Sequence, residues 1–225
     1  MLSLSKHERA LFQGPLALLP GVLAAVVGLI CGVGGRVSLC AMIGAAEGTG
    51  LTAMGDHSEF LDVRQHGFAR VAVCVPEVRV ADPAFNASAH LKMLESVHQA
   101  GAHYALCPEL GLSAYSCGDL FFQDALLRAA NEALRIVASA SAAWNMIISV
   151  GLPLVVDGLL FNSAVTLYRG RPLAVTPKAY PPNYREFYEL RWFQPAGAAR
   201  ATTIRVLGQD AVSYTHLTLP TILLV

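Results

Sequence analysis

The order of the segments from residue 68 onward most constrains the fold of this chain. An apolar, β-branched run over residues 70–75 predicts a strand, and a helical period of apolar residues follows over 87–100. The alternation then repeats as a strand over 103–107, a long helix from Asp119 to about residue 143, and a strand over 146–152. Strands that alternate with helices predict parallel strands with helices packed on their sheet.

Two short turn signals then change this pattern. Asp157-Gly158 separates apolar runs over 154–156 and 160–168, and Arg169-Gly170 leads into a further run over 171–176. Two-residue turns of this kind join antiparallel strands. The sequence therefore predicts an α/β layered domain with a mixed sheet.

The ends of the two predicted helices carry typical boundary residues. Asp82-Pro83 and Asn86 favour a helix start at this point, and Gly101 suits the position just after the helix end. Asp119 has the side chain of a good N-cap, so we expect the second helix to begin there.

The first 64 residues differ from the rest of the chain. No Asp, Glu, Lys or Arg occurs between Arg9 and Arg36. As a helix, residues 10–35 would be roughly 39 Å long, enough to cross a bilayer. Lys6 and Arg9 precede them, as in a membrane anchor or a removed targeting segment. A third interpretation is translated upstream DNA, with Met54 as the true start. We treat residues 1–64 as an apolar extension outside the fold, and its origin stays open.

The charge balance and the cysteines exclude two classes of function. Lys+Arg and Asp+Glu each total 16, so the formal net charge is zero and no nucleic-acid partner is expected. The five cysteines are irregularly spaced and form no pair with zinc-site spacing, so no metal is expected. An odd number of unclustered cysteines favours a reducing, cytoplasmic compartment.

Two ionisable residues stand beside prolines at the ends of strand-like runs. Pro108-Glu109 follows the apolar run 104–107, and Pro177-Lys178 follows the run 172–175. A charge at the end of a buried strand is costly and more often marks a site than a core position. Glu109 and Lys178 are therefore the candidate catalytic residues.

The residues around this pair resemble a known family. Glu109 to Tyr115 (ELGLSAY), Asp119 to Asp124 (DLFFQD) and Lys178 to Glu189 (KAYPPNYREFYE) are similar to the nitrilase (carbon–nitrogen hydrolase) superfamily. Within it they most resemble the N-terminal glutaminase domain of the glutamine-dependent NAD synthetases. The resemblance covers residues 65–204. It implies a four-layer αββα sandwich, of which this chain holds an incomplete part.

The resemblance also implies roles for individual residues. Glu109 would be the general base and Lys178 the cation that stabilises the oxyanion. Tyr115 and Tyr184 would line the glutamine pocket, with core packing as the alternative. Glu186 would support Lys178 through a buried contact, with an ordinary surface carboxylate as the alternative.

The third member of the family's Glu-Lys-Cys triad is absent, because no cysteine follows Lys178. Cys117 is the nearest substitute, but the family places its nucleophile after the lysine, so we interpret Cys117 as structural. We therefore expect an incomplete enzyme that has no nucleophile and no activity of its own.

For the intact protein, the resemblance implies glutamine hydrolysis that supplies ammonia for NAD formation from nicotinate adenine dinucleotide. ATP and Mg²⁺ would serve a synthetase domain that this chain lacks, and no cofactor is expected in the fragment. The family also implies a homo-oligomeric intact protein. Two alternatives stay open: a free-standing nitrilase-type amidase or carbamoylase, and a membrane-tethered, non-catalytic interaction domain.

The last residues form a separate segment. Residues 213–221 (SYTHLTLPT) resemble a string found at the ends of unrelated proteins, where it is attributed to translated sequencing adapter. The predicted glutaminase domain therefore covers residues 65–209, and residues 210–225 are predicted to be a non-native tail.

Overall fold

The computed structural model describes residues 66–213, so residues 1–65 and 214–225 are not discussed as structure. The candidate membrane segment 10–35, the alternative start at Met54 and most of the predicted tail lie outside this range. The helices and strands described below lie in one compact unit that begins at Arg70.

A mixed sheet forms one layer of this unit. Within the described residues it has seven strands in the order β1-β2-β3-β4-β5-β7-β6. Their bounds are Val71–Val73 (β1), Tyr104–Leu106 (β2), Ile147–Val156 (β3), Leu159–Tyr168 (β4), Arg171–Pro177 (β5), Thr203–Val206 (β6) and Gln209–Ser213 (β7). Strands β1, β2 and β3 are parallel, and β3, β4 and β5 are antiparallel. The prediction of a mixed α/β sheet is confirmed.

Both predicted turns join antiparallel strands. Asp157 and Gly158 have φ of 52° and 76°, and Arg169 and Gly170 have φ of 47° and 76°. Two successive left-handed residues twist as the flanking strands do, which is why the aspartate–glycine signal was reliable. The first hairpin is longer than predicted, because β3 continues unbroken to Val156 instead of ending at residue 152.

The helix boundaries were predicted only in part. Helix α4 covers Pro83–Gln99; Asp82 accepts a hydrogen bond from the Phe85 amide at its start, and Gly101 has a left-handed φ of 73° just past its end. Helix α5 covers Asp124–Ala140 and begins after Gln123, so the prediction of Asp119 as its N-cap is wrong. Asp119 lies instead in a 3-10 segment, Tyr115–Phe122.

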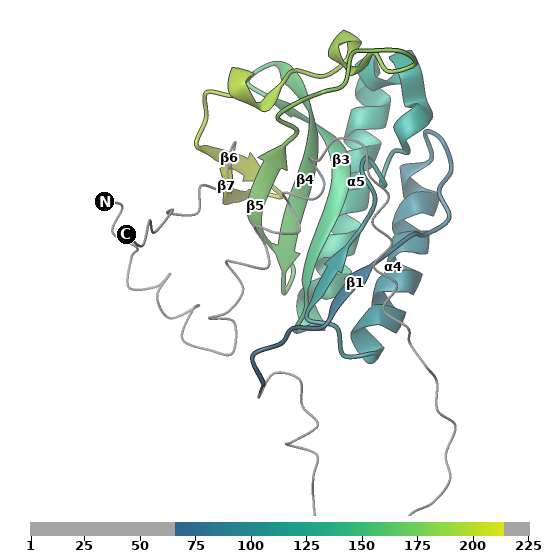
Figure 1. The fold of residues 1–225 in the computed structure, drawn as a ribbon, viewed down its shortest axis with the longest axis vertical. Coiled ribbons are helices and arrows are strands. Elements are labelled where there is room, and N and C mark those ends of the chain that lie inside the picture. Colours follow the sequence, from purple (N-terminus) through teal and green to yellow (C-terminus); the bar gives the residue numbers. More distant parts are fainter. Residues whose placement is uncertain (1–65, 214–225) are drawn as a thin grey trace, which may run out of the picture. The chain divides into compact units, whose positions relative to one another are not determined.

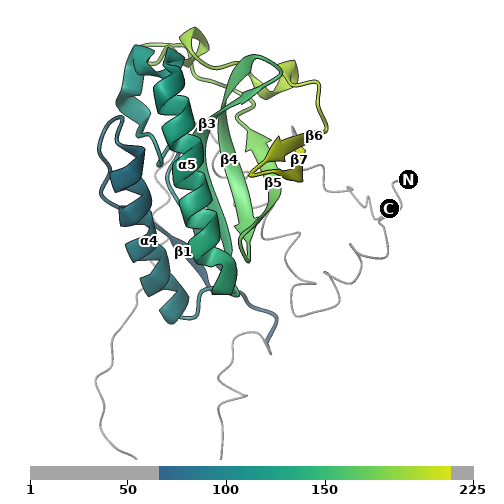
Figure 2. The ribbon, with the colours of Figure 1, turned by 180° about the vertical axis from the view of Figure 1, so that it is seen from behind.

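Both helices pack side by side on one face of the sheet (Figures 1 and 2). Leu94 of α4 and Leu134 and Val137 of α5 are fully buried against it. Strand residues alternate between faces, so one set of positions meets the helices; it includes Ile148, Val150, Leu152, Val165 and Leu167. Each such side chain stabilises the fold by about 1.5–3 kcal/mol.

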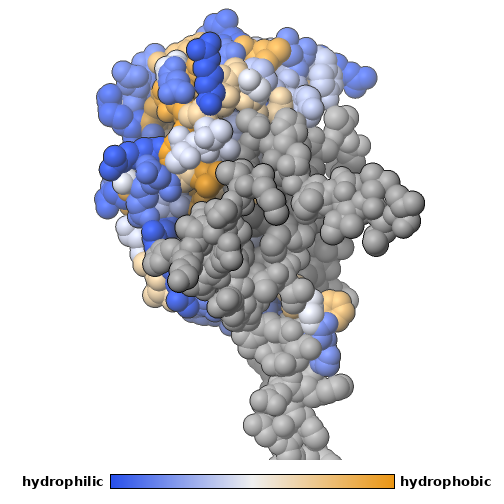
Figure 3. Space-filling view, turned by 90° about the vertical axis from the view of Figure 1, so that its left-hand side faces the viewer, coloured by the Kyte–Doolittle hydropathy of each residue, from blue (hydrophilic) through white to orange (hydrophobic). Residues whose placement is uncertain are grey.

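Apolar side chains also remain at the surface. Figure 3 shows one face of the molecule on which apolar patches lie among hydrophilic side chains. Leu173 of β5 and Val212 of β7 are exposed by 41% and 39%. No helix among residues 66–213 is long and apolar enough to cross a membrane.

Candidate active site

A tight turn after β2 presents Glu109. The Leu112 amide donates to the Gly151 carbonyl of β3 (3.1 Å), and Leu110 has a left-handed φ of 51°. A Cβ on Gly151 would lie 2.5 Å from both the Leu110 nitrogen and the Pro108 oxygen. The turn therefore rests directly on the β3 backbone, which fixes the direction of Glu109.

A buried histidine supports the same turn from α4. His90 Nδ1 lies 2.7 Å from the Asn86 carbonyl oxygen, and a Cβ on Gly111 would lie 2.7 Å from His90 Nε2. No hydrogen-bond partner of His90 Nε2 is found in the described part of the chain. Burial lowers the pKa of His90, so the ring is neutral at pH 7 with its proton on Nδ1.

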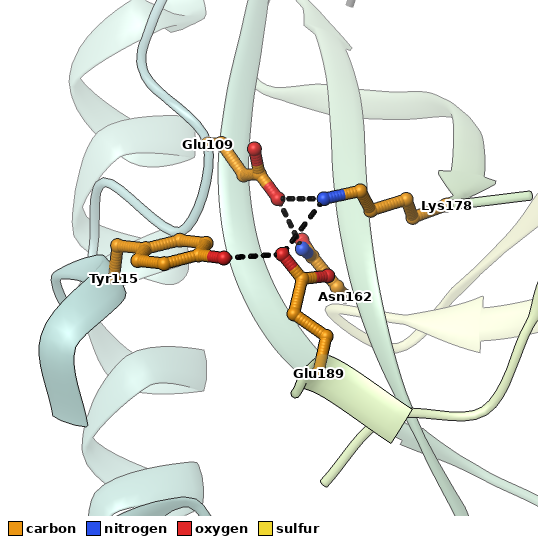
Figure 4. Close-up of polar contacts among 5 residues, drawn as sticks. All are labelled: Glu109, Tyr115, Asn162, Lys178 and Glu189. Carbon is orange, nitrogen blue, oxygen red and sulfur yellow. Dashed lines mark hydrogen bonds and ion pairs between the residues drawn. The ribbon is translucent and has the colours of Figure 1, made fainter. Parts of the chain in front are cut away.

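Lys178 follows β5 and reaches the same place. Its amide donates to the Asn162 carbonyl of β4 (2.8 Å), which continues the strand pairing by one residue. Its Nζ lies 2.7 Å from Glu109 Oε1 and 2.9 Å from Glu189 Oε1 (Figure 4). Glu109 and Lys178 are 69 positions apart in the chain and meet only through the fold.

The second carboxylate against Lys178 is Glu189, and the prediction of Glu186 for this contact is wrong. Glu189 is only 1% exposed and begins a 3-10 turn, Glu189–Arg191, whereas Glu186 is exposed to solvent. The two glutamates are three residues apart in an irregular segment. Neither helical nor strand periodicity could therefore tell which one faces inward.

The two predicted tyrosines lie in different surroundings. The Tyr115 hydroxyl donates to Glu189 Oε1 at 2.5 Å, so Tyr115 belongs to the cluster (Figure 4). Tyr184 is 57% exposed and packs edge-on against Phe187, with ring centres 6.0 Å apart. Pocket lining by either ring stays a prediction.

Asn162 is a site residue that sequence reasoning missed. Its Nδ2 donates to Glu109 Oε1 at 2.5 Å, and the residue is 4% exposed. An asparagine inside an apolar run carries no spacing signal. The only hint in the sequence was its polarity within the predicted strand 160–168.

The cluster has more acidic groups than basic ones. Two carboxylates, Glu109 and Glu189, share one ammonium, Lys178. Burial opposes the charged form of Lys178, but hydrogen bonds to Glu109 and Glu189 outweigh it and raise its pKa. Burial and the bond to Glu189 also raise the pKa of Tyr115, which keeps its hydroxyl a donor.

Cys117 lies in a setting that disfavours a thiolate. It is 4% exposed, and its Sγ donates to the Ser113 carbonyl at 3.0 Å. Burial raises the pKa of its thiol. A buried, protonated thiol is a poor nucleophile, which agrees with a structural role.

An ion pair at the surface ties together the two segments that carry Tyr115 and Glu189. Asp119 accepts two hydrogen bonds from Arg191 (both 2.7 Å) and one from Trp192 Nε1 (2.9 Å). Beneath it, Phe121 packs edge-on against Phe193, with ring centres 4.8 Å apart. The hydrogen bonds to Arg191 and Trp192 explain why Asp119 does not cap α5.

Amide hydrolysis of this kind needs a base, a cation that stabilises the oxyanion, and a nucleophile. The cluster offers the first two. Glu109 Oε2 has no partner drawn in Figure 4 and can take a proton, and the Lys178 ammonium can stabilise an oxyanion. Within residues 66–213 no group of three or more His, Cys, Asp or Glu side chains is placed to hold a metal ion.

Comparison with known proteins gives a consistent result. The carbon–nitrogen hydrolase family profile matches residues 70–211. The glutamine-dependent NAD(+) synthetase of Mycobacterium tuberculosis H37Rv is 43% identical over 158 residues, which cover 70% of this chain and 23% of the relative. The human protein of that name is 29% identical over 132 residues, covering 59% and 19%. The chain thus spans about a quarter or less of the length of these relatives.

Two solved structures share the fold. The glutamine-dependent NAD(+) synthetase of Cytophaga hutchinsonii has a TM-score of 0.60 and 23% identity, over 64% of this chain and 25% of that one. The enzyme of Acinetobacter baumannii, solved with ADP, has a TM-score of 0.51 and 21% identity, over 61% and 26%.

Proposed function

This chain belongs to the carbon–nitrogen hydrolase family, and from that premise we propose that it is the first part of the glutamine-hydrolysing half of a glutamine-dependent NAD synthetase. The observation that carries the proposal is the ion pair between Glu109 and Lys178 at 2.7 Å, at the ends of two strands. The sequence similarity to the mycobacterial synthetase supports the choice of glutamine as substrate.

In this proposal each residue of the cluster has a defined task. Glu109 takes the proton of an attacking thiol and returns it to the departing ammonia. Lys178 stabilises the negative oxygen that forms when the thiol adds to the carboxamide carbon. Glu189 holds the Lys178 ammonium between the two carboxylates, and Tyr115 holds Glu189.

The chain as written is proposed to be inactive. No cysteine follows Lys178, where the family places its nucleophile, and burial raises the pKa of the Cys117 thiol, so among the described residues no thiol is offered as a nucleophile beside Glu109 and Lys178. We expect the purified chain to release no more ammonia from glutamine than a buffer blank does. Ammonia release above that blank, lost on Glu109→Gln, would contradict this.

The remaining steps belong to the rest of the intact protein. Ammonia would pass to a synthetase part that uses ATP and Mg²⁺ to convert nicotinate adenine dinucleotide to NAD. We propose an oligomeric intact protein in the cytoplasm. The buried, free thiols of Cys74, Cys107 and Cys117 support a reducing compartment.

The decisive experiment uses the intact reading frame, recovered by resequencing across the codons for Gln209 onward. We expect glutamine-dependent NAD formation by its product, and Glu109→Gln to reduce it by at least about 100-fold. Activity with added ammonium should remain, because it bypasses glutamine hydrolysis. A product that hydrolyses amides or carbamoyl compounds but forms no NAD would be a free-standing amidase instead.

A further inference from the structure

We infer that Asn162 is the positioning residue that decides which oxygen of Glu109 acts as the base. The inference deepens the proposed function, since it rests on Glu109 as the proton acceptor. It starts from one contact, the 2.5 Å hydrogen bond from Asn162 Nδ2 to Glu109 Oε1.

The chemistry of the amide fixes the direction of this bond. An ionised carboxylate can only accept hydrogen bonds, so the nitrogen of the asparagine amide must face Glu109. The same Oε1 also accepts from Lys178 Nζ at 2.7 Å. Two donors therefore occupy Oε1, whereas Oε2 turns away from the other four residues of the cluster (Figure 4). The lone pairs of Oε2 are left for the proton.

The position of Asn162 in β4 makes this arrangement rigid. Alternation along the strand sends Val165 and Leu167 toward the helices and Asn162 to the opposite face, where Glu109 lies. Asn162 is paired with Pro153 of β3 and is 4% exposed. Its side chain has little freedom to leave the carboxylate.

Asn162 also connects the two catalytic candidates through a single residue. Its carbonyl accepts from the Lys178 amide at 2.8 Å while its side chain donates to Glu109. A displacement of β4 would thus move both groups together. The other titratable groups of the cluster bond elsewhere: Glu189 accepts hydrogen bonds from Lys178 and from Tyr115.

A double-mutant cycle on the 225-residue chain tests the contact. Unfolding equilibrium constants are measured in urea for the parent, Asn162→Ala, Glu109→Ala and the double variant. We expect the two effects to be coupled by at least about 5-fold, because each substitution removes the same hydrogen bond. A control cycle of Asn162→Ala with Glu132→Ala, on the exposed side of α5, should show no coupling. Additive effects in the first cycle would overturn the inference.

A charge variant gives a second, pH-dependent test that packing alone would not produce. Asn162→Asp places a third carboxylate against Glu109, beside Glu189 and a single Lys178. We expect its unfolding constant to exceed that of the parent at least about 10-fold at pH 7.5, and to approach it at pH 5, where one carboxylate can take a proton. Asn131→Asp, exposed on α5, should show no such difference.

Every outcome of the second test is informative. An Asn162→Asp protein that is less stable than the parent at pH 7.5 and approaches the parent's stability at pH 5 supports the inference. Equal loss at both pH values, or folding at neither, contradicts it. Neither test depends on glutamine turnover, so a failure of the proposed function leaves this result readable by itself.

Discussion

At the scale of single residues, the cluster depends on one cation shared by two carboxylates. Lys178 contacts Glu109 and Glu189 at 2.7 and 2.9 Å, and its side chain is 18% exposed. Removing the ammonium would leave two like charges facing each other in a partly desolvated place. The cost of breaking such a pair exceeds what forming it contributes.

We predict that Lys178→Met lowers the free energy of unfolding by about 2 kcal/mol at pH 7, less than for a fully buried pair because Glu109 is partly solvated. The hydrogen bonds to Glu109 and Glu189 raise the pKa of Lys178, so its stabilisation is complete below the ordinary value of 10.5 and is lost as pH rises through the folded-state pKa. Urea titrations should show the difference from the parent narrowing above pH 10.5. Lys92→Met, on the exposed side of α4, should stay within about 0.5 kcal/mol; an equal loss there would contradict the prediction.

A second prediction concerns His90 and acid. Burial lowers its pKa below the ordinary 6.5, so the unfolded chain binds a proton more readily than the folded one. The folded state should therefore lose stability as pH falls below about 6.5. In His90→Gln this part of the pH dependence should disappear, and in His98→Gln it should persist. Urea denaturation curves at pH 7.5 and pH 5.5 give the loss of unfolding free energy between these two pH values. An equal loss in the parent and in both variants would rule out His90 as the source.

The site could be predicted only where a residue ended a recognisable segment. Glu109 and Lys178 stand beside prolines after apolar runs, which made them visible. Asn162 lies inside a strand, and Glu189 lies in a segment without regular period. Only the fold shows that Asn162 contacts the Glu109 carboxylate and that Glu189 contacts the Lys178 ammonium. Their roles in chemistry stay predictions.

At the scale of elements, the turn that carries Glu109 requires a glycine on the neighbouring strand. The clash of a Cβ on Gly151 is with the backbone of Pro108 and Leu110, which cannot rotate away as a side chain would. Because Gly151 has no side chain, the turn that carries Glu109 can lie directly against the β3 backbone.

We predict that Gly151→Ala destabilises the chain by about 2 kcal/mol, because the turn or the strand must shift to admit the methyl group. Gly197→Ala is the matched control, since nothing lies within 4 Å of the Cβ it would add. Urea denaturation of both variants gives the comparison. A Gly151→Ala protein as stable as Gly197→Ala would mean that the turn is not held by this contact.

The elements that sequence analysis located well are those with local causes. The two hairpin turns follow from left-handed residues at adjacent positions, and the start of α4 follows from the Asp82 cap. Asp119 has the same chemistry as Asp82 but bonds to Arg191 and Trp192, more than 70 positions away. A long-range ion pair replaced a local cap there, and local preference could not reveal it.

At the scale of the whole unit, the last hairpin occupies an unexpected place in the sheet. Strand β7 lies between β5 and β6. It is parallel to β5, with Ala174 opposite Val212, and antiparallel to β6, with Ile204 opposite Ala211. Ala211 is 1% exposed and belongs to the same core as the helices. The predicted domain end at residue 209 falls at the first residue of this strand.

Chains ended at two positions separate the contribution of β7 from that of the residues beyond it. A chain that stops after residue 208 lacks β7, so β6 loses its partner and Val206 and Ala211 leave the core. We expect it to be less stable than the parent by at least about 2 kcal/mol, from lost apolar burial alone. A chain that stops after residue 213 keeps every described strand and should match the parent. If urea denaturation shows the two shortened chains to be equally stable, β7 contributes nothing to the stability of the fold. The stable part of the sheet would then end at β5, the strand that leads to Lys178.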